Sequence, residues 1–157
     1  MFWNYALVFL VAMVPVAELR LAVPMAVGMG IPELNAILVC VLGNMLPVPF
    51  IYFFARKILV WGMEKKYIGW FCRALHNKGE KAGRKLTAKA GRYGVFLALM
   101  LFVGIPLPGT GAWTGTMGAS FLNMGIKSTV VSVCLGVVIA GLIMLIASTG
   151  VFAVIGL

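Results

Sequence analysis

The sequence predicts an all-α integral membrane protein. Its predicted architecture is an inverted repeat of a re-entrant helical hairpin and a transmembrane helix, with a basic amphipathic cytoplasmic loop between the repeats. Three observations predict this fold class. Of the 157 residues, 62% are hydrophobic. The basic residues are concentrated in one central stretch. Proline, glycine or charged residues interrupt the apolar sequence at matching places in the two halves, which is typical of helices that break inside a membrane.

The composition limits the classes of protein to which the chain can belong. A chain this apolar is neither disordered nor a typical nucleic-acid-binding domain, despite a formal net charge of +9. Its length suits a single membrane domain over residues 1–157. Three cysteines and one histidine argue against a disulfide scaffold or a zinc site, and we expect no cofactor. An enzyme is the least favoured class, because the sequence has no Asp and no serine–histidine arrangement. The four acidic residues are Glu18, Glu33, Glu64 and Glu80.

Residues 1–32 are predicted to form the first re-entrant hairpin. A membrane-spanning helix needs about 20 apolar residues, and the apolar segments 2–17 and 21–31 are both shorter than this. We expect the tip of the hairpin near residues 18–24. The alternative is one long tilted helix that carries a buried Glu and Arg. No lysine or arginine precedes the first apolar segment, so we expect no removable signal peptide.

Residues 33–55 are predicted to form the first transmembrane helix. The segment is long enough to cross a bilayer at a rise of about 1.5 Å per residue, and Glu33 suits a helix start. Pro47 and Pro49 predict a kink within this helix. Asn44 lies before the kink, and we expect its side chain either to hydrogen-bond across a pocket or to pack between helices.

Residues 56–92 are predicted to form a basic loop on the cytoplasmic side, following the positive-inside rule. Apolar residues recur on one helical face of this loop, which fits a helix in the headgroup region with its basic face toward anionic lipid. Nucleic-acid binding is the alternative interpretation of the charge, but membrane topology already accounts for it. The basic residues of the loop are Arg56, Lys57, Lys65, Lys66, Arg73, Lys78, Lys81, Arg84, Lys85, Lys89 and Arg92.

Residues 93–126 are predicted to form the second re-entrant hairpin, and residues 128–150 the second transmembrane helix. The apolar segment 93–103 is too short to span, a proline- and glycine-rich break follows, and residues 112–122 form the return arm. Lys127 belongs on the cytoplasmic side by the same charge rule. The second hairpin therefore enters from the cytoplasmic face and the first from the outer face. This topology predicts a protein of the cytoplasmic membrane with both termini on the outer side.

Two motifs resemble those of a known family. Glu-Leu-Arg-x-x-x-Pro (residues 18–24) and Pro-Leu-Pro-Gly-Thr-Gly-Ala-Trp-Thr-Gly (residues 106–115) are similar to segments of the small multidrug export family, a group of short bacterial and archaeal membrane proteins. The resemblance covers nearly the whole chain and implies a transporter. A more distant likeness is to the DedA (SNARE-associated, VTT-domain) membrane proteins, which pair two re-entrant hairpins with spanning helices. Some of these move lipid phosphates. They carry arginines in the second hairpin, whereas residues 106–118 here contain no basic residue.

Glu18 and Arg20 are the strongest candidates for functional residues. An ionisable side chain inside a membrane is costly and is therefore a functional candidate by default. Burial and a neighbouring Arg act in opposite directions on the proton affinity of a carboxyl group, so Glu18 is a candidate for loading and releasing a proton. The alternative is a static Glu–Arg pair that merely fixes the hairpin. Pro24 closes the same motif and is included among the candidate residues.

The break in the second hairpin is the other candidate site. Its prolines lack backbone N–H groups and prevent a regular helix, and its glycines permit close approach of a ligand. The threonines supply hydroxyl groups, and the N–H groups at the start of the return arm point toward an anion or a polar group. The alternative is a purely structural kink. The candidate residues in this break are Pro106, Pro108, Gly109, Thr110, Gly111 and Thr114.

Three functional hypotheses follow from the sequence. The first is a secondary transporter of small amphiphilic or cationic compounds, coupled to protons through Glu18. The second is a lipid transporter or scramblase in which Arg20 meets a headgroup. The third is a non-transporting membrane scaffold. Membrane lipid and a small-molecule or lipid substrate are the expected partners, without nucleic acid. We also expect a homodimer, because two spans and two hairpins form a thin wall around a cavity.

Overall fold

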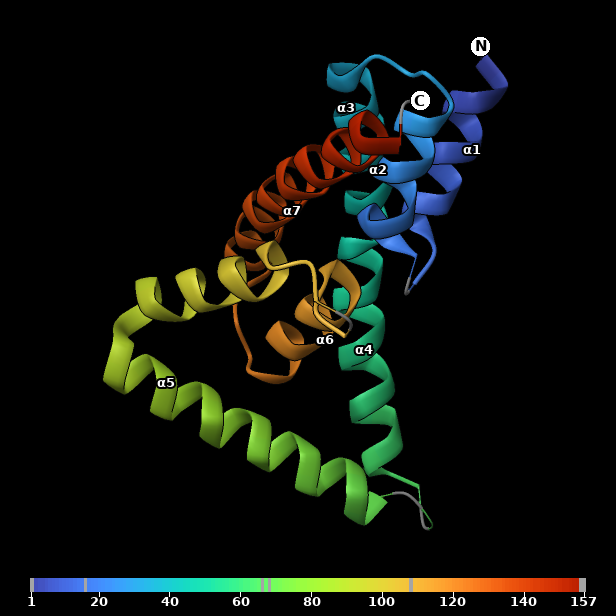
Figure 1. Ribbon diagram of the computed structural model, residues 1–157. Helices are drawn as coiled ribbons and strands as arrows, with labels where there is room; N and C mark the ends of the chain where they lie inside the picture. Colours follow the sequence, from blue (N-terminus) through green and yellow to red (C-terminus); the bar gives the residue numbers. More distant parts are fainter. Residues whose placement is uncertain (1, 16, 66, 68, 108, 156–157) are drawn as a thin grey trace.

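The computed structural model describes residues 2–15, 17–65, 67, 69–107 and 109–155 (Figure 1). Within these ranges the chain forms helices and no strand, which confirms the all-α class. The helices are α1 (Phe2–Met13), α2 (Glu18–Gly28), α3 (Glu33–Met45), α4 (Val48–Met63), α5 (Gly69–Gly104), α6 (Ala112–Phe121) and α7 (Ile126–Ile155).

Helices α1 and α2 form an antiparallel pair (Figure 1). The alternative of one long helix over this segment is therefore wrong. The chain turns before Glu18 and not within residues 18–24, and Pro24 lies inside α2. The turn falls here because Pro15 cannot donate the hydrogen bond that would continue α1. Glu18 then begins α2 with a left-handed φ of 43°.

Helices α3 and α4 together form one apolar rod, Glu33–Met63, of 31 residues. The interruption expected from the prolines is a short turn at Leu46 and Pro47, and both residues keep right-handed helical angles. Pro49 lies in the first turn of α4, where the missing N–H leaves no hydrogen bond unmade. The helix continues beyond residue 55, the expected end of the span, because apolar residues such as Leu59 remain buried.

The second long apolar helix is Ile126–Val151, within α7. This segment and Glu33–Met63 are each long and apolar enough to cross a membrane. Large apolar side chains such as Phe54 and Ile146 lie exposed on them, at 65% and 71%. Exposed apolar side chains on long helices suit contact with lipid. Both transmembrane helices predicted from the sequence are therefore present as helices in the fold.

Helix α5 is bent by 94° between Gly69–Lys85 and Thr87–Gly104, which we call its basic half and its apolar half. Gly91, close to the bend, has a φ of 68°, which suits glycine far better than other residues. Counted as one broken span, α5 would be a third membrane-crossing element. The basic half lies at the end of the molecule opposite the start of α1 and the end of α7 (Figure 1).

Helix packing is alike in the two halves of the chain. Helix α1 packs on α3 just as α5 packs on α7, and α2 packs on α7 just as α6 packs on α4. Each short helix after a break therefore lies against the long helix of the other half. Such an exchange of partners is expected of two repeats related by symmetry. The inverted orientation of the repeats and their re-entry into the bilayer stay predictions.

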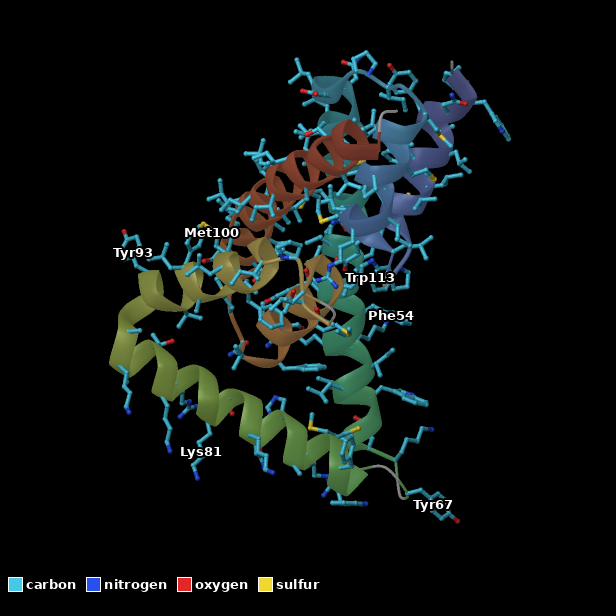
Figure 2. All side chains as sticks on the ribbon, in the orientation of Figure 1. Phe54, Tyr67, Lys81, Tyr93, Met100 and Trp113 are labelled. Atoms are coloured by element: carbon cyan, nitrogen blue, oxygen red, sulfur yellow. The ribbon has the colours of Figure 1, made fainter. Side chains whose placement is uncertain are left out.

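Cysteine labelling in intact cells can test the predicted topology. We expect Lys81→Cys to react with a membrane-impermeant maleimide only after the cells are lysed, and Trp3→Cys to react before lysis. Both variants are made with the three native cysteines replaced by alanine. Trp3 is 78% exposed and Lys81 points away from the rest of the molecule (Figure 2), so each new thiol is accessible to the reagent. Labelling of Lys81→Cys in intact cells would contradict the topology.

Candidate functional site

The two helix breaks meet in the middle of the molecule. Among the described residues three hydrogen bonds join them, and we call this contact the tip junction. The backbone N–H of Trp113 donates to Glu18 Oε1 at 3.1 Å, and the indole Nε1–H of Trp113 donates to the carbonyl of Met13 at 3.2 Å. Arg20 Nη2 donates to Thr110 Oγ1 at 2.9 Å. Segments about 90 residues apart in the sequence are therefore held together by polar contacts.

Glu18 acts as the cap of α6. Helix α6 has no side-chain cap from its own segment, so its first N–H groups need an acceptor from elsewhere. The Glu18 carboxylate supplies that acceptor, and a negative charge is favoured at a helix N-terminus. Glu18 is 7% exposed, and its φ of 43° is unusual for a residue other than glycine. From the sequence we expected the N–H groups at the start of the return arm to point toward an anion or a polar group. In the structure, the carboxyl group of Glu18 from the other half of the chain occupies that position.

Arg20 does not form an ion pair with Glu18. Among the described residues the one salt bridge joins Arg84 and Glu80 at 2.7 Å. Glu18 and Arg20 instead each reach a different residue of the second break, Trp113 and Thr110. The direct Glu18–Arg20 ion pair considered from the sequence is therefore not formed here, whereas a purely structural role of the two side chains stays an alternative. Both charges are used to hold one half of the chain against the other.

The second break is organised by Thr110 and by two glycines. Thr110 Oγ1 lies 2.6 Å from the carbonyl oxygen of Ile105 and is also the acceptor for Arg20. Gly109 has a φ of 86°, which side chains rarely tolerate. Gly111 has an extended backbone, but a Cβ there would overlap the Glu18 carboxylate. The absence of a side chain at Gly111 thus permits the approach of Glu18 to α6.

A small cavity adjoins the tip junction. Its volume is about 10 Å³, roughly the space of one water molecule. Asn44 is 1% exposed, and its Oδ1 has no hydrogen-bond partner within the described part of the chain. A buried polar atom without a partner calls for an explanation such as a bound water or ligand. The polar and tip residues that line the cavity are Glu18, Arg20, Asn44, Pro106, Thr110 and Gly111.

The structure separates the other candidate residues from this cavity. Pro24 is not among its lining residues, and Thr114 lines a different, apolar cavity. Pro108 lies outside the described residues. Sequence reasoning missed the wall formed by Val137 and Ala140 of α7. An apolar transmembrane sequence contains little that indicates which of its faces borders a cavity.

Within the described ranges, no three His, Cys or Glu side chains lie close enough together to hold a metal ion. Comparison with known proteins gives one match. Residues 18–143 match the family described as "Putative small multi-drug export protein". No curated protein and no solved structure matches the chain.

Proposed function

Because the chain belongs to the small multi-drug export family, we propose that it is a secondary transporter that exports small amphiphilic or cationic compounds. The observation that supports this proposal best is the tip junction, in which a buried carboxylate from one half holds the first turn of a broken helix from the other half. Contacts of this kind at the midplane are the places where transporters bind substrate and coupling ions.

The tip junction suits a gate that opens by exchanging partners. An ionised Glu18 accepts a charge-assisted hydrogen bond from Trp113, and such bonds are roughly twice as strong as neutral ones. A proton on Glu18 would weaken this bond and also its interaction with the α6 dipole. Protonation would therefore favour separation of the two halves. The cavity of about 10 Å³ is too small for a substrate, so this conformation is the closed one.

The chemistry of the cavity favours a cation as the exported species. Glu18 supplies a carboxylate, and Asn44 supplies an oxygen that has no partner among the described residues. Arg20 is held by Thr110 and is the one basic side chain in the lining. A proton and a cation would compete for Glu18, which is the requirement for exchange of protons for substrate. Proton coupling through Glu18 therefore follows from the competition of two ligands for one group.

A transport assay with the protein reconstituted in liposomes can test this function. Purified protein is reconstituted, a proton gradient is imposed, and uptake of the lipophilic cation tetraphenylphosphonium is measured. We expect Glu18→Gln to lower proton-driven uptake by about tenfold or more, since hydrogen bonds to charged groups contribute about 1.5–3 kcal/mol. Glu64→Gln removes an exposed carboxylate at the end of α4 and serves as the matched control, with uptake like that of the wild type.

Three outcomes would contradict the proposal. The first is proton-driven uptake by Glu18→Gln at the wild-type rate. The second is movement of labelled lipid between leaflets in the same liposomes, lost in Arg20→Ala, without uptake of the cation. That result would favour the lipid transporter. The third is the absence of both lipid movement and uptake, with several lipophilic cations tested. That result would favour the membrane scaffold.

A further inference from the structure

Two further cavities lie away from the tip junction, beside the bend of α5. The larger has a volume of about 780 Å³ and lies between the bend of α5 and the turn that precedes α7. The smaller has a volume of about 250 Å³ and lies between the apolar half of α5 and α6. The two cavities share three wall residues, Val95, Leu122 and Met124, so they adjoin each other.

The larger cavity has a positively charged wall. Arg84 and Arg92 line it together with the single acidic residue Glu80. Glu80 is paired with Arg84, whereas Arg92 has no salt-bridge partner among the residues that the structure describes. Ser128, in the first turn of α7, contributes a hydroxyl group beside the positive end of the helix dipole. Arginine side chains with a neighbouring helix N-terminus suit a phosphate group.

The smaller cavity is apolar. Leu99 and Phe102 of α5 and Ala119 of α6 line it, and Thr114 is its one polar side chain. A Cβ added at Gly118 would meet no atom within 4 Å, so the cavity has open space beside this glycine. An apolar lining of this kind suits part of an acyl chain. Its position beside the apolar half of α5 agrees with a ligand that enters from the membrane.

We infer that the paired cavities bind one anionic phospholipid, with its phosphate headgroup at Arg84 and Arg92 and an acyl chain beside Gly118. Neither cavity alone identifies the ligand, because a basic cavity accepts any anion and an apolar cavity accepts any small apolar molecule. Their shared wall favours a molecule that carries both groups. The proposal is independent of the transport function, because none of these residues lines the cavity at the tip junction.

Binding measurements on the delipidated protein in detergent can test the site. The protein is titrated with short-chain phosphatidylglycerol, with phosphatidylcholine of the same chains, and with inorganic phosphate. We expect phosphatidylglycerol to bind most tightly. Arg92→Gln should weaken that binding about fivefold, since a Lys or Arg beside anionic lipid contributes about 1 kcal/mol. Arg84→Gln should weaken it further, because the Glu80 carboxylate would then lose its partner and repel the phosphate.

The matched control for charge is Lys81→Gln. Lys81 is on the basic half of α5, as Arg84 is, but it points away from the rest of the molecule (Figure 2) and does not line the cavity. We expect it to bind phosphatidylglycerol as the wild type does. Equal weakening by Lys81→Gln and Arg92→Gln would show diffuse attraction of the lipid to the positive charge of α5 and would overturn the proposal. Arg92→Lys keeps the charge and should restore most of the affinity.

The matched test of the acyl chain is Gly118→Leu, whose Cβ meets open space and whose side chain is expected to occupy part of the apolar cavity. We expect it to weaken phosphatidylglycerol binding about tenfold, because the acyl chain loses its buried surface. Inorganic phosphate should bind this variant and the wild type equally. If phosphate binds as tightly as the lipid, and Gly118→Leu affects neither, then the site accepts a free anion and the lipid proposal is wrong.

Discussion

Gly111→Ala is expected to abolish proton-driven transport and to destabilise the junction between the two halves. A Cβ at this position would overlap the Glu18 carboxylate, which is held in place by its hydrogen bond to Trp113. Glu18 would have to withdraw, and α6 would lose its only cap from the described part of the chain. We expect a loss of about 1–3 kcal/mol in the free energy of unfolding, the usual cost of overpacking. Uptake of tetraphenylphosphonium should fall to the level of empty liposomes.

The control for this prediction is Gly118→Ala, within α6, the helix that follows Gly111. A Cβ at Gly118 meets open space, so the change adds the same methyl group without a clash. Alanine is also the better helix former by about 1 kcal/mol, so this variant should be as stable as the wild type or more so. Thermal unfolding in detergent and uptake by liposomes are measured for both variants. Equal behaviour of the two would show that Glu18 does not need the space beside Gly111.

Gly136→Leu is expected to separate α5 from α7 and to prevent stable folding. A Cβ at Gly136 would lie 2.6 Å from the carbonyl oxygen of Met100 and 2.8 Å from the Cβ of Val103. Neither atom is the end of a flexible side chain, so relief requires movement of a helix backbone. Packing of small residues is a main source of helix association in membranes, where the hydrophobic effect between helices is absent. We expect at least about 3 kcal/mol of destabilisation, the upper part of the range for overpacked interiors.

Gly150→Leu is the matched control for Gly136→Leu. Gly150 lies in the same helix, and a Cβ there meets no atom within 4 Å. The change of residue is identical, so the difference between the two variants measures the contact with α5 alone. The fraction of protein that remains monodisperse on heating in detergent provides the measurement. If Gly136→Leu unfolds at the same temperature as Gly150→Leu, the close packing of α5 on α7 does not contribute to stability.

The sequence predicted the type of secondary structure of each segment better than its boundaries. The two long apolar segments became long helices, because about 20 apolar residues can be satisfied in a bilayer in few other ways. The tip of the first hairpin was expected near residues 18–24, whereas the chain turns just before Glu18. Pro24 marked the expected position, but a proline inside a helix can be accommodated, and the chain turns at Pro15 instead.

Glu18 and Arg20 were identified from the sequence for a reason that does not depend on their neighbours. Charges in an apolar segment are expensive, and the cost alone marks them as candidates. What they contact was decided by tertiary structure. Glu18 caps α6 and Arg20 binds Thr110, because the two breaks are brought together by helices that exchange partners between the halves.

The sequence by itself determined that this is a helical membrane protein with two broken helices and a basic segment, because hydropathy and charge act locally along the chain. Only the tertiary structure decided which side chains join the two breaks, that Asn44 and α7 border the same cavity, and that the bend of α5 creates two adjoining cavities. The physical reason is the same in each case. These features depend on how closely helix backbones approach, and that distance is set by pairs of residues far apart in the sequence.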